Sequence, residues 1–476
     1  MTRKRHEKAI AKKKQKRVAK QRRRKQAGSK SIRLRFAPES PATAFGGMAL
    51  TEKLARRAGL WGMLDSRMPT RRGYDWATIV KSLAVGLMTG PRGTFAAEDV
   101  RQDPVLQKLV GLEEGVPEEA TVWRSLAQLA QTPYALETLE KETRSASKRL
   151  IEAVPQRSLG PEGFASVFID GTLLEGSERR EGTKVLRDKG RGLLWTVSFV
   201  GPVPVCARLC PEGEGEQTAA RELLKKTCAD VLEPAGLGDR ALVLMDSLHG
   251  NGPSLNVIEE HSLNYIVGAG ALGLARTVLA EQPERQWVPT PEFDRRRKVE
   301  DSAVCMASIQ CQEWEEPRTL VGRRWHVPGD MFPHQVAVIT NLTPEHPQLA
   351  ALMERKKMNF AEAVLWLYDR KGKCETYFKS MLSDLGLHHP PCQSWSGNAA
   401  LYAIGLVAGM LSAITAILDP EGKTRGVPTI ATVRRRLWSV SASITRHART
   451  TVATVLGLSE PWRREIEGTW QRIARC

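Results

Sequence analysis

Two acidic residues each follow a short apolar run, and a third acid lies between basic residues in a helical pattern. Asp170 follows the apolar residues 167–169, and Asp246 follows residues 241–245. Both runs are typical of buried strands, and we expect residues 171–172 to form a turn that leaves Asp170 at its strand's end. Carboxylates at strand ends of an α/β sheet lie where such sheets bind ligands.

The third acid is Glu375, within residues 364–385. At about 100° per residue, one helix over this stretch would carry five side chains on a single face. An exposed helix with ion pairs is the simpler interpretation of such alternating charge. The two upstream acids favour a site instead, because three carboxylates together need cations, and oxygen ligands select Mg²⁺ or Mn²⁺. The five side chains are Tyr368, Lys371, Glu375, Lys379 and Leu382.

Asp170, Asp246 and Glu375 resemble the catalytic acids of DDE transposases from bacterial insertion sequences. The resemblance includes Tyr368, which precedes Glu375 in the predicted helix, and Lys379, which follows it. One group of that family carries the helical signature Tyr-x2-Arg-x3-Glu-x6-Lys. The resemblance implies an α/β fold with a ribonuclease-H-like core. It also implies that the three acids are both the catalytic residues and the ligands of two Mg²⁺ or Mn²⁺ ions.

The sequence departs from this signature at two positions. Lys371 stands at the Arg position, although Arg370 is adjacent, and Leu382 stands at the final Lys position, with Lys379 one turn earlier. Lys does not reproduce a bidentate Arg contact with phosphate. The resemblance still implies that Tyr368, Arg370, Lys371 and Lys379 hold DNA phosphates beside the cut.

The resemblance also predicts the reaction and its partners. A hydrolytic cut would free a 3′-hydroxyl at the element's end, and that hydroxyl would then attack target DNA. The expected partner is double-stranded DNA, comprising terminal inverted repeats and target, held by a homodimer and without any membrane. Two rival functions remain open: a metal-dependent nuclease that does not join ends, and a catalytically idle DNA-binding relative.

Charge is distributed unevenly along the 476 residues. The formal net charge is +18, and residues 1–36 hold 17 Lys or Arg and one acid, Glu7, which gives +16 for this stretch. We expect residues 1–41 to form a disordered basic tail whose affinity for polyanions falls as salt rises. The tail lacks the apolar region of a secretory signal. The eight cysteines include no Cys-x2-Cys pair, so a reduced bacterial cytoplasm with nucleoid DNA is the expected location.

The remaining residues are more numerous than one hydrophobic core usually accommodates, so we expect several domains. Residues 118–126 form a helix that could enter a DNA groove with Arg124 exposed, although an ordinary packed helix is equally consistent with the sequence. Trp287, Trp314 and Trp325 are candidates for stacking on a base, but packing is the simpler role. The predicted divisions are a helical DNA-binding domain at 42–155, the first part of the core at 156–280, a β-rich insertion at 281–345, the second part with the catalytic helix at 346–425, and a helical C-terminal region at 426–476.

Two further stretches suggest other classes of protein. Residues 399–418 are uncharged and long enough to span a membrane, but half of them are Ala, Gly, Ser or Thr, and we expect a buried core helix with Asn398 as its N-cap. Residues 268–273 are Gly-rich after a strand, as in dinucleotide sites. A basic run at 295–298 replaces the acidic partner that such sites need, so we reject that interpretation.

Overall fold

The computed structural model describes residues 42–475 except 187–189, 271–272, 312–313, 315, 420–426 and 448–449, together with residue 16. The predicted basic tail therefore lies almost wholly outside the described residues. Residues 42–476 form one compact unit.

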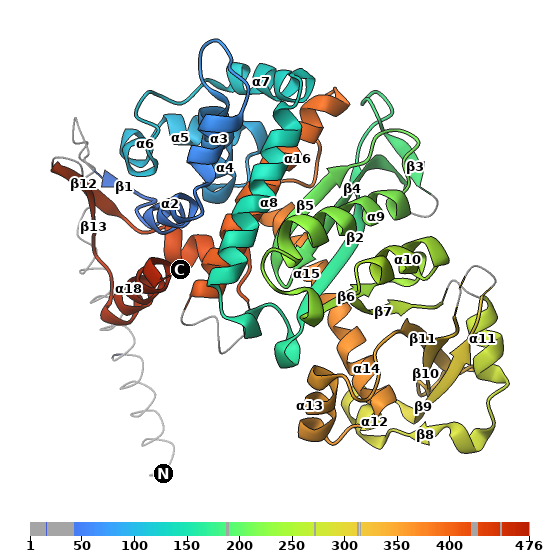
Figure 1. Ribbon diagram of the computed structural model, residues 1–476. Coiled ribbons are helices and arrows are strands. Elements are labelled where there is room, and N and C mark those ends of the chain that lie inside the picture. Colours follow the sequence, from blue (N-terminus) through green and yellow to red (C-terminus); the bar gives the residue numbers. More distant parts are fainter. Residues whose placement is uncertain are drawn as a thin grey trace, which may run out of the picture. The chain divides into compact units, whose positions relative to one another are not determined.

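A mixed sheet of ten strands begins with an antiparallel trio (Figure 1). The strand β2 (Ala165–Glu175) pairs with β4 (Gly190–Val200), which pairs with β5 (Val203–Leu209). Gly201, with φ of +57°, makes the tight turn between β4 and β5, where a Cβ would lie 2.7 Å from the Leu159 backbone. On the outer side of β4 lies the short strand β3 (Lys184–Leu186).

Two parallel strands continue the sheet on the other side of β2. The strand β6 (Ala241–Met245) pairs with β2, and β7 (Asn264–Gly268) pairs with β6. Parallel strands require crossover connections, which here contain the helices α9 (Glu216–Thr227) and α10 (Gly252–Glu260). The spatial order of these five strands in the sheet is therefore β5-β4-β2-β6-β7.

The strands of the predicted insertion extend this same sheet. The strand β11 (His334–Thr340) pairs antiparallel with β7, and the strands beyond it in the sheet are β10 (Arg318–His326), β9 (Glu300–Ile309) and β8 (Val288–Pro289). The insertion is therefore continuous with the core sheet (Figure 1). Trp287 and Trp314 are buried there, which favours packing for both. The helices of this part are α11 (Gly273–Ala280), α12 (Pro291–Arg297) and α13 (Pro347–Lys356).

Helices precede the sheet in the chain, as the sequence predicted. Their apolar faces share a core with the long helix α16 (Trp395–Leu418), which packs against α4, α7 and α8 as well as against β5. The helices are α2 (Met48–Arg57), α3 (Leu60–Arg67), α4 (Trp76–Thr89), α5 (Ala96–Arg101), α6 (Pro104–Val110), α7 (Glu119–Gln131) and α8 (Ala135–Ala153).

The C-terminal region corrects a prediction. Residues 426–476 were expected to be helical, but α17 (Ile430–Val433) and one π-helical turn end at Trp438, and a β-hairpin follows. The hairpin strands β12 (Ala442–His447) and β13 (Thr450–Val455) are rich in β-branched residues, which favour strands. The strand β12 also pairs with β1 (Ala42–Thr43), and the chain then forms the amphipathic helix α18 (Glu460–Arg475).

Among the described helices, α16 is the only one long and apolar enough to cross a membrane, and 94% of its apolar window is buried inside the protein. The expectation of a buried core helix agrees with this packing, but the predicted cap was wrong. Ser394 is the N-cap and accepts from the Gly397 amide. Asn398 is fully buried one turn later, where its side chain bonds to both backbone groups of Cys392 and to the Ser394 carbonyl.

We predict that Asn398→Ala lowers the free energy of unfolding by about 1–3 kcal/mol, because the buried Cys392 amide loses the hydrogen bond that it donates to Asn398. Asn256→Ala, at an exposed position of α10, is the matched control and should change stability by less than about 0.5 kcal/mol. Urea-induced unfolding measures both. Equal stability of the two variants would mean that Asn398 does not hold the turn before α16.

Candidate active site

The register of two strands brings two of the predicted acids together. Phe168 of β2 lies opposite Leu244 of β6 in the parallel pair, and β6 ends at Met245. Asp170 follows Phe168 by two residues, and Asp246 follows Leu244 by two residues. Their side chains therefore emerge next to each other just beyond the end of β6.

The position of Asp170 within its strand differs from the prediction. The strand β2 continues past Gly171 to Glu175, so Asp170 is not a strand end and residues 171–172 are not a turn. The prediction failed because the pairing of β2 with β4 continues to Glu175, whereas its pairing with β6 stops at Phe168. At Asp170, β2 is therefore paired with β4 on one side but has no paired strand on the side of β6.

The ammonium group of Lys371 lies between the two carboxylates. Its Nζ is 3.2 Å from Asp170 Oδ2 and 3.8 Å from Asp246 Oδ2. Burial alone would lower the pKa of Lys371, but the charges of Asp170 and Asp246 raise it above its ordinary value, so the side chain is protonated. Burial raises the pKa of Asp170, and the charge of Asp246 adds to this effect while Lys371 opposes it.

Lys371 reaches this position because the predicted helix is broken. Instead of one helix over residues 364–385, the chain forms α14 (Phe360–Tyr368), a 3₁₀ turn (Asp369–Gly372) and α15 (Lys373–Asp384). In the turn, Asp369 lies near two arginines of α12, with its Oδ2 3.5 Å from Arg296 Nη2 and 3.7 Å from Arg297 Nη2. The single face predicted for this stretch is lost, and Leu382 is buried.

Glu375 does not join the other two acids. It lies exposed in the first turn of α15, and the described residues include no hydrogen bond or ion pair to it. Its neighbour Cys374 is buried instead, and burial followed by the charge of Asp170 raises the pKa of that thiol. Lys379 is likewise exposed on α15.

Tyr368 is the remaining signature residue that lies near the acids. A Cβ built on Gly268, at the end of β7, would be 2.6 Å from the Tyr368 hydroxyl. Burial is the main cause of its raised pKa, to which the charges of Asp246 and Asp170 contribute. Tyr368 therefore packs with its hydroxyl against the edge of the sheet where the acids emerge.

The two arginines that were predicted to contact DNA, Arg370 and Arg124, lie away from the acids. The guanidinium of Arg370 is stacked 3.4 Å from the centre of the Trp366 ring and lines a hollow of about 670 Å³ that also contains Arg157 and Lys373. Arg124 is exposed on α7, and its Nε donates to the Ala120 carbonyl one turn earlier. Neither arginine is near the acids by any contact among the described residues.

Sequence reasoning missed two residues beside the acids. Glu216 begins α9, and its Oε1 accepts from the Gly171 amide at 3.0 Å. His249 follows Asp246 by three residues, and its Nε2 lies 3.9 Å from Asp246 Oδ1 and 3.7 Å from Glu216 Oε1. Proximity in sequence to Asp246 was the one signal that could have identified His249.

The donor set suits a hard divalent cation, since carboxylate oxygens are the preferred ligands of Mg²⁺ and Mn²⁺. The position of the Lys371 ammonium supports this, because it is a cation held between Asp170 and Asp246. Among the described residues, however, no three His, Cys, Asp or Glu side chains already lie close enough to hold a metal ion. A bound ion therefore requires these side chains to move together.

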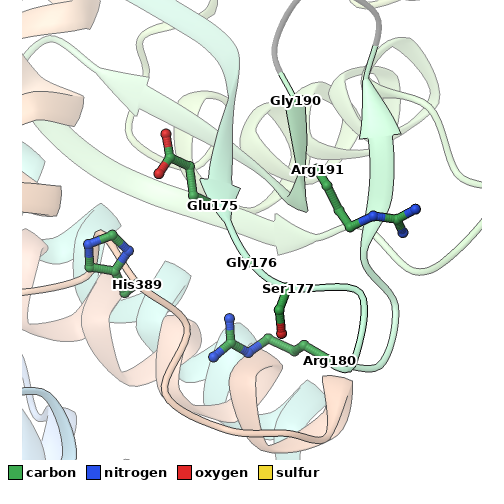
Figure 2. A pocket seen from close by; sticks show the side chains of 7 residues that line it. All are labelled: Glu175, Gly176, Ser177, Arg180, Gly190, Arg191 and His389. Atoms are coloured by element: carbon green, nitrogen blue, oxygen red, sulfur yellow. The ribbon is translucent and has the colours of Figure 1, made fainter.

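A second hollow, of about 560 Å³, lies where β2 ends and β4 begins (Figure 2). Arg180, Arg191 and His389 line it together with Glu175, five residues after Asp170 on β2. In Figure 2 the Arg180 side chain extends toward His389, whereas the Arg191 side chain points away from both. Arg180 Nε also donates to the Cys392 carbonyl at 3.0 Å, which fixes the loop after β2 to the turn before α16.

The model of the family described as "Transposase DDE domain group 1" matches residues 24–476. A similar solved structure is described as "Cryo-EM structure of piggyBac transposase synaptic complex with hairpin DNA"; it is 13% identical, with 83% of this chain and 79% of that chain covered and a TM-score of 0.41. No curated protein matches.

We predict that Lys371→Met destabilises the protein increasingly as pH rises from about 4 to about 7. The raised pKa of Lys371 means that its contribution is fully present below its ordinary value of 10.5 and is lost only as pH rises through the raised value. The raised pKa of Asp170 means that its ionisation, from 3.8 upward, costs stability. Without the ammonium this cost grows.

Urea-induced unfolding of wild type and variant at the two pH values measures the difference. Lys379→Met, at an exposed position of α15, is the control and should follow the wild type at both pH values. A stability difference for Lys371→Met that is the same at both pH values would contradict the ion pairing.

Proposed function

The chain belongs to the DDE transposase family, and on this premise we propose that it cuts DNA at the ends of a bacterial insertion sequence and joins the freed 3′-hydroxyl ends to target DNA. The observation that carries the proposal is the pair Asp170 and Asp246, set side by side by strand register with a cation between them. We further propose that the sheet from β5 to β7 is the ribonuclease-H-like core of this enzyme.

Asp170 and Asp246 would hold the divalent cations, and Glu375 would complete the set when DNA is bound. Mg²⁺ or Mn²⁺ ions bound by such acids activate an attacking hydroxyl and stabilise the leaving oxygen of a phosphodiester. Glu375 lies in the first turn of α15, directly after the 3₁₀ turn that carries Lys371. A shift of this turn would move Glu375 and Lys371 together.

Lys371 would have two roles in succession. In the protein without DNA, it neutralises the two acids and so offsets the repulsion between them. If a divalent cation took its place, the released ammonium would be free to contact a phosphate next to the cut. This second role is the one that the family signature assigns to the Arg at this position.

Two hollows lined by basic residues suggest where the DNA backbone would lie. The hollow beside β2 offers Arg180, Arg191 and His389 (Figure 2), and the hollow with Arg370 and Lys373 offers further cations. Guanidinium and ammonium groups bind phosphates without reading sequence. We propose that Tyr368 and Lys379 add contacts at the cut, and that Arg124 and the basic tail contact DNA farther from it.

We propose a homodimer that holds two terminal inverted repeats on the bacterial nucleoid, because joining both ends of an element to one target requires two active sites. This assembly is inferred from the family resemblance and from the basic charge of residues 1–36. The rival functions, a nuclease without joining activity and an idle DNA-binding relative, are outcomes of the same experiment.

We predict that purified protein with Mn²⁺ cuts labelled duplexes taken from the DNA that flanks its own coding sequence and releases a 3′-hydroxyl. Asp170→Asn should bind these duplexes normally yet cut at least about 100-fold more slowly, because one cation ligand is lost. Asp239→Asn, an exposed acid at the other end of β6, should cut like the wild type. Gel electrophoresis of the labelled products measures the rates.

Addition of a supercoiled plasmid as target separates the alternatives. Joined products support the transposase, whereas cut ends that are never joined indicate the nuclease. Binding of the duplex without any cut by the wild type indicates the idle relative. If Asp170→Asn cuts at the wild-type rate, Asp170 is not a ligand of the catalytic cation.

A further inference from the structure

We propose that Glu216 is a carboxylate ligand of the divalent-cation site and that His249 is the residue that positions it beside Asp246. This inference rests on the proposed function, since it adds a ligand to the site of Asp170 and Asp246. It differs from the family signature, which places all the acids at the ends of strands and in the helix of Glu375.

Glu216 is held next to Asp170 by a shared donor. The Gly171 amide donates both to Asp170 Oδ1 and to Glu216 Oε1, each at 3.0 Å. The two oxygens are therefore at most twice that distance apart. The Glu216 side chain is only 11% exposed, although it begins its helix. A carboxylate that burial and a backbone amide fix beside a second carboxylate has a defined position before any ligand arrives.

Gly171 gives Glu216 the space for this approach. A Cβ built at this position would lie 2.6 Å from Glu216 Cδ and 2.9 Å from its Oε2. Alternation along β2 places Phe168 against Tyr377 of α15 and Gly171 against α9, so Glu216 approaches from the face opposite Lys371. The pairing of β2 with β6 stops at Phe168, so the edge of β2 beside Asp170 is left open between the two faces.

His249 is a buried polar group with unused bonding capacity. It is 0% exposed, and neither ring nitrogen has a hydrogen-bond partner in the described structure. Its Nε2 faces Glu216 Oε1 at 3.7 Å and Asp246 Oδ1 at 3.9 Å, too far for a hydrogen bond to either. A buried donor or acceptor without a partner is unfavourable, because its bonds to water are lost and not replaced. A small inward movement of either carboxylate would give His249 a partner.

Each pair among the three carboxylates thus has one nitrogen close to both of its members. The Gly171 amide lies between Asp170 and Glu216, His249 Nε2 between Glu216 and Asp246, and Lys371 Nζ between Asp246 and Asp170. Glu375 has no contact of this kind in the described structure. A divalent cation bound by the three carboxylates would replace the repulsion among them by attraction to the cation. The carboxylates would move inward to bind it, and His249 would then gain a hydrogen-bond partner.

The test measures Mn²⁺ binding by the whole protein without DNA, by electron paramagnetic resonance of free Mn²⁺. We predict that Glu216→Gln weakens Mn²⁺ binding by at least about 10-fold, as the loss of a carboxylate ligand requires. Glu222→Gln is the matched control, because Glu222 lies on the same helix and is exposed. Circular dichroism and thermal unfolding confirm that each variant is folded.

Gly171→Ala provides an independent variant that leaves every charge in place. Its new methyl group meets the end of the flexible Glu216 side chain, which can turn away without disturbing the strand. It should weaken Mn²⁺ binding in the same direction as Glu216→Gln. His249→Ala should weaken it by about 10-fold, and His249→Gln, which keeps a side-chain nitrogen, should recover part of the loss.

The outcomes separate this inference from the proposed function. If Asp170→Asn and Asp246→Asn lose Mn²⁺ but Glu216→Gln and Gly171→Ala bind it like the wild type, the role of Glu216 is refuted and the proposed function stands. If none of the four variants differs from the wild type, the cation site itself is elsewhere and both proposals fail. Loss in all four, with Glu222→Gln unchanged, supports both.

Discussion

Repulsion between two carboxylates is the constraint on which the rest of this structure depends. The parallel register of β2 and β6 sets Asp170 and Asp246 side by side at a point where β6 has ended. Both side chains are partly shielded from water, so neighbouring cations decide whether the pair is tolerated. In this structure the ammonium group of Lys371 offsets the repulsion between the two carboxylates. A divalent cation, with twice the charge, would offset it more strongly.

The surrounding elements position Lys371, whose positive charge offsets this repulsion. The segment with Lys371 is a short 3₁₀ turn between two helices, and ion pairs from Arg296 and Arg297 to Asp369 tie this turn to the part of the chain that was predicted as an insertion. The strands of that part extend the same sheet through β11 and β7. The position of the turn therefore depends on the far half of the sheet. The helix α16 joins the same sheet to the helical front of the chain.

Short apolar runs were sufficient to predict the two strands that carry Asp170 and precede Asp246, because a buried strand leaves a continuous pattern in the sequence. The same pattern located Asp246 correctly after β6. It failed for Asp170, because Gly171 and Thr172 look like a turn while the long pairing with β4 keeps them extended. The C-terminal hairpin was missed although it is local, because this region was taken as helical while its strands are rich in β-branched residues.

The candidate site was only partly predictable, since its geometry arises from contacts between distant segments. Helical spacing placed Lys371 and Glu375 on one face, but the 3₁₀ turn separates them and directs only Lys371 to the acids. Nothing in the sequence around Glu216 distinguishes it from other acids at helix starts. Its place became visible only through the amide of Gly171 and the buried ring of His249. The basic tail and the roles of the DNA contacts stay predictions.

The most direct measurement is the anomalous diffraction of Mn²⁺ in crystals of the protein grown with this ion. A peak within coordination distance of Asp170 and Asp246, with the Lys371 ammonium moved out from between them, is the result that we predict. A map in which Lys371 still bridges the two carboxylates and Mn²⁺ binds elsewhere would contradict the proposal that these acids form the catalytic cation site.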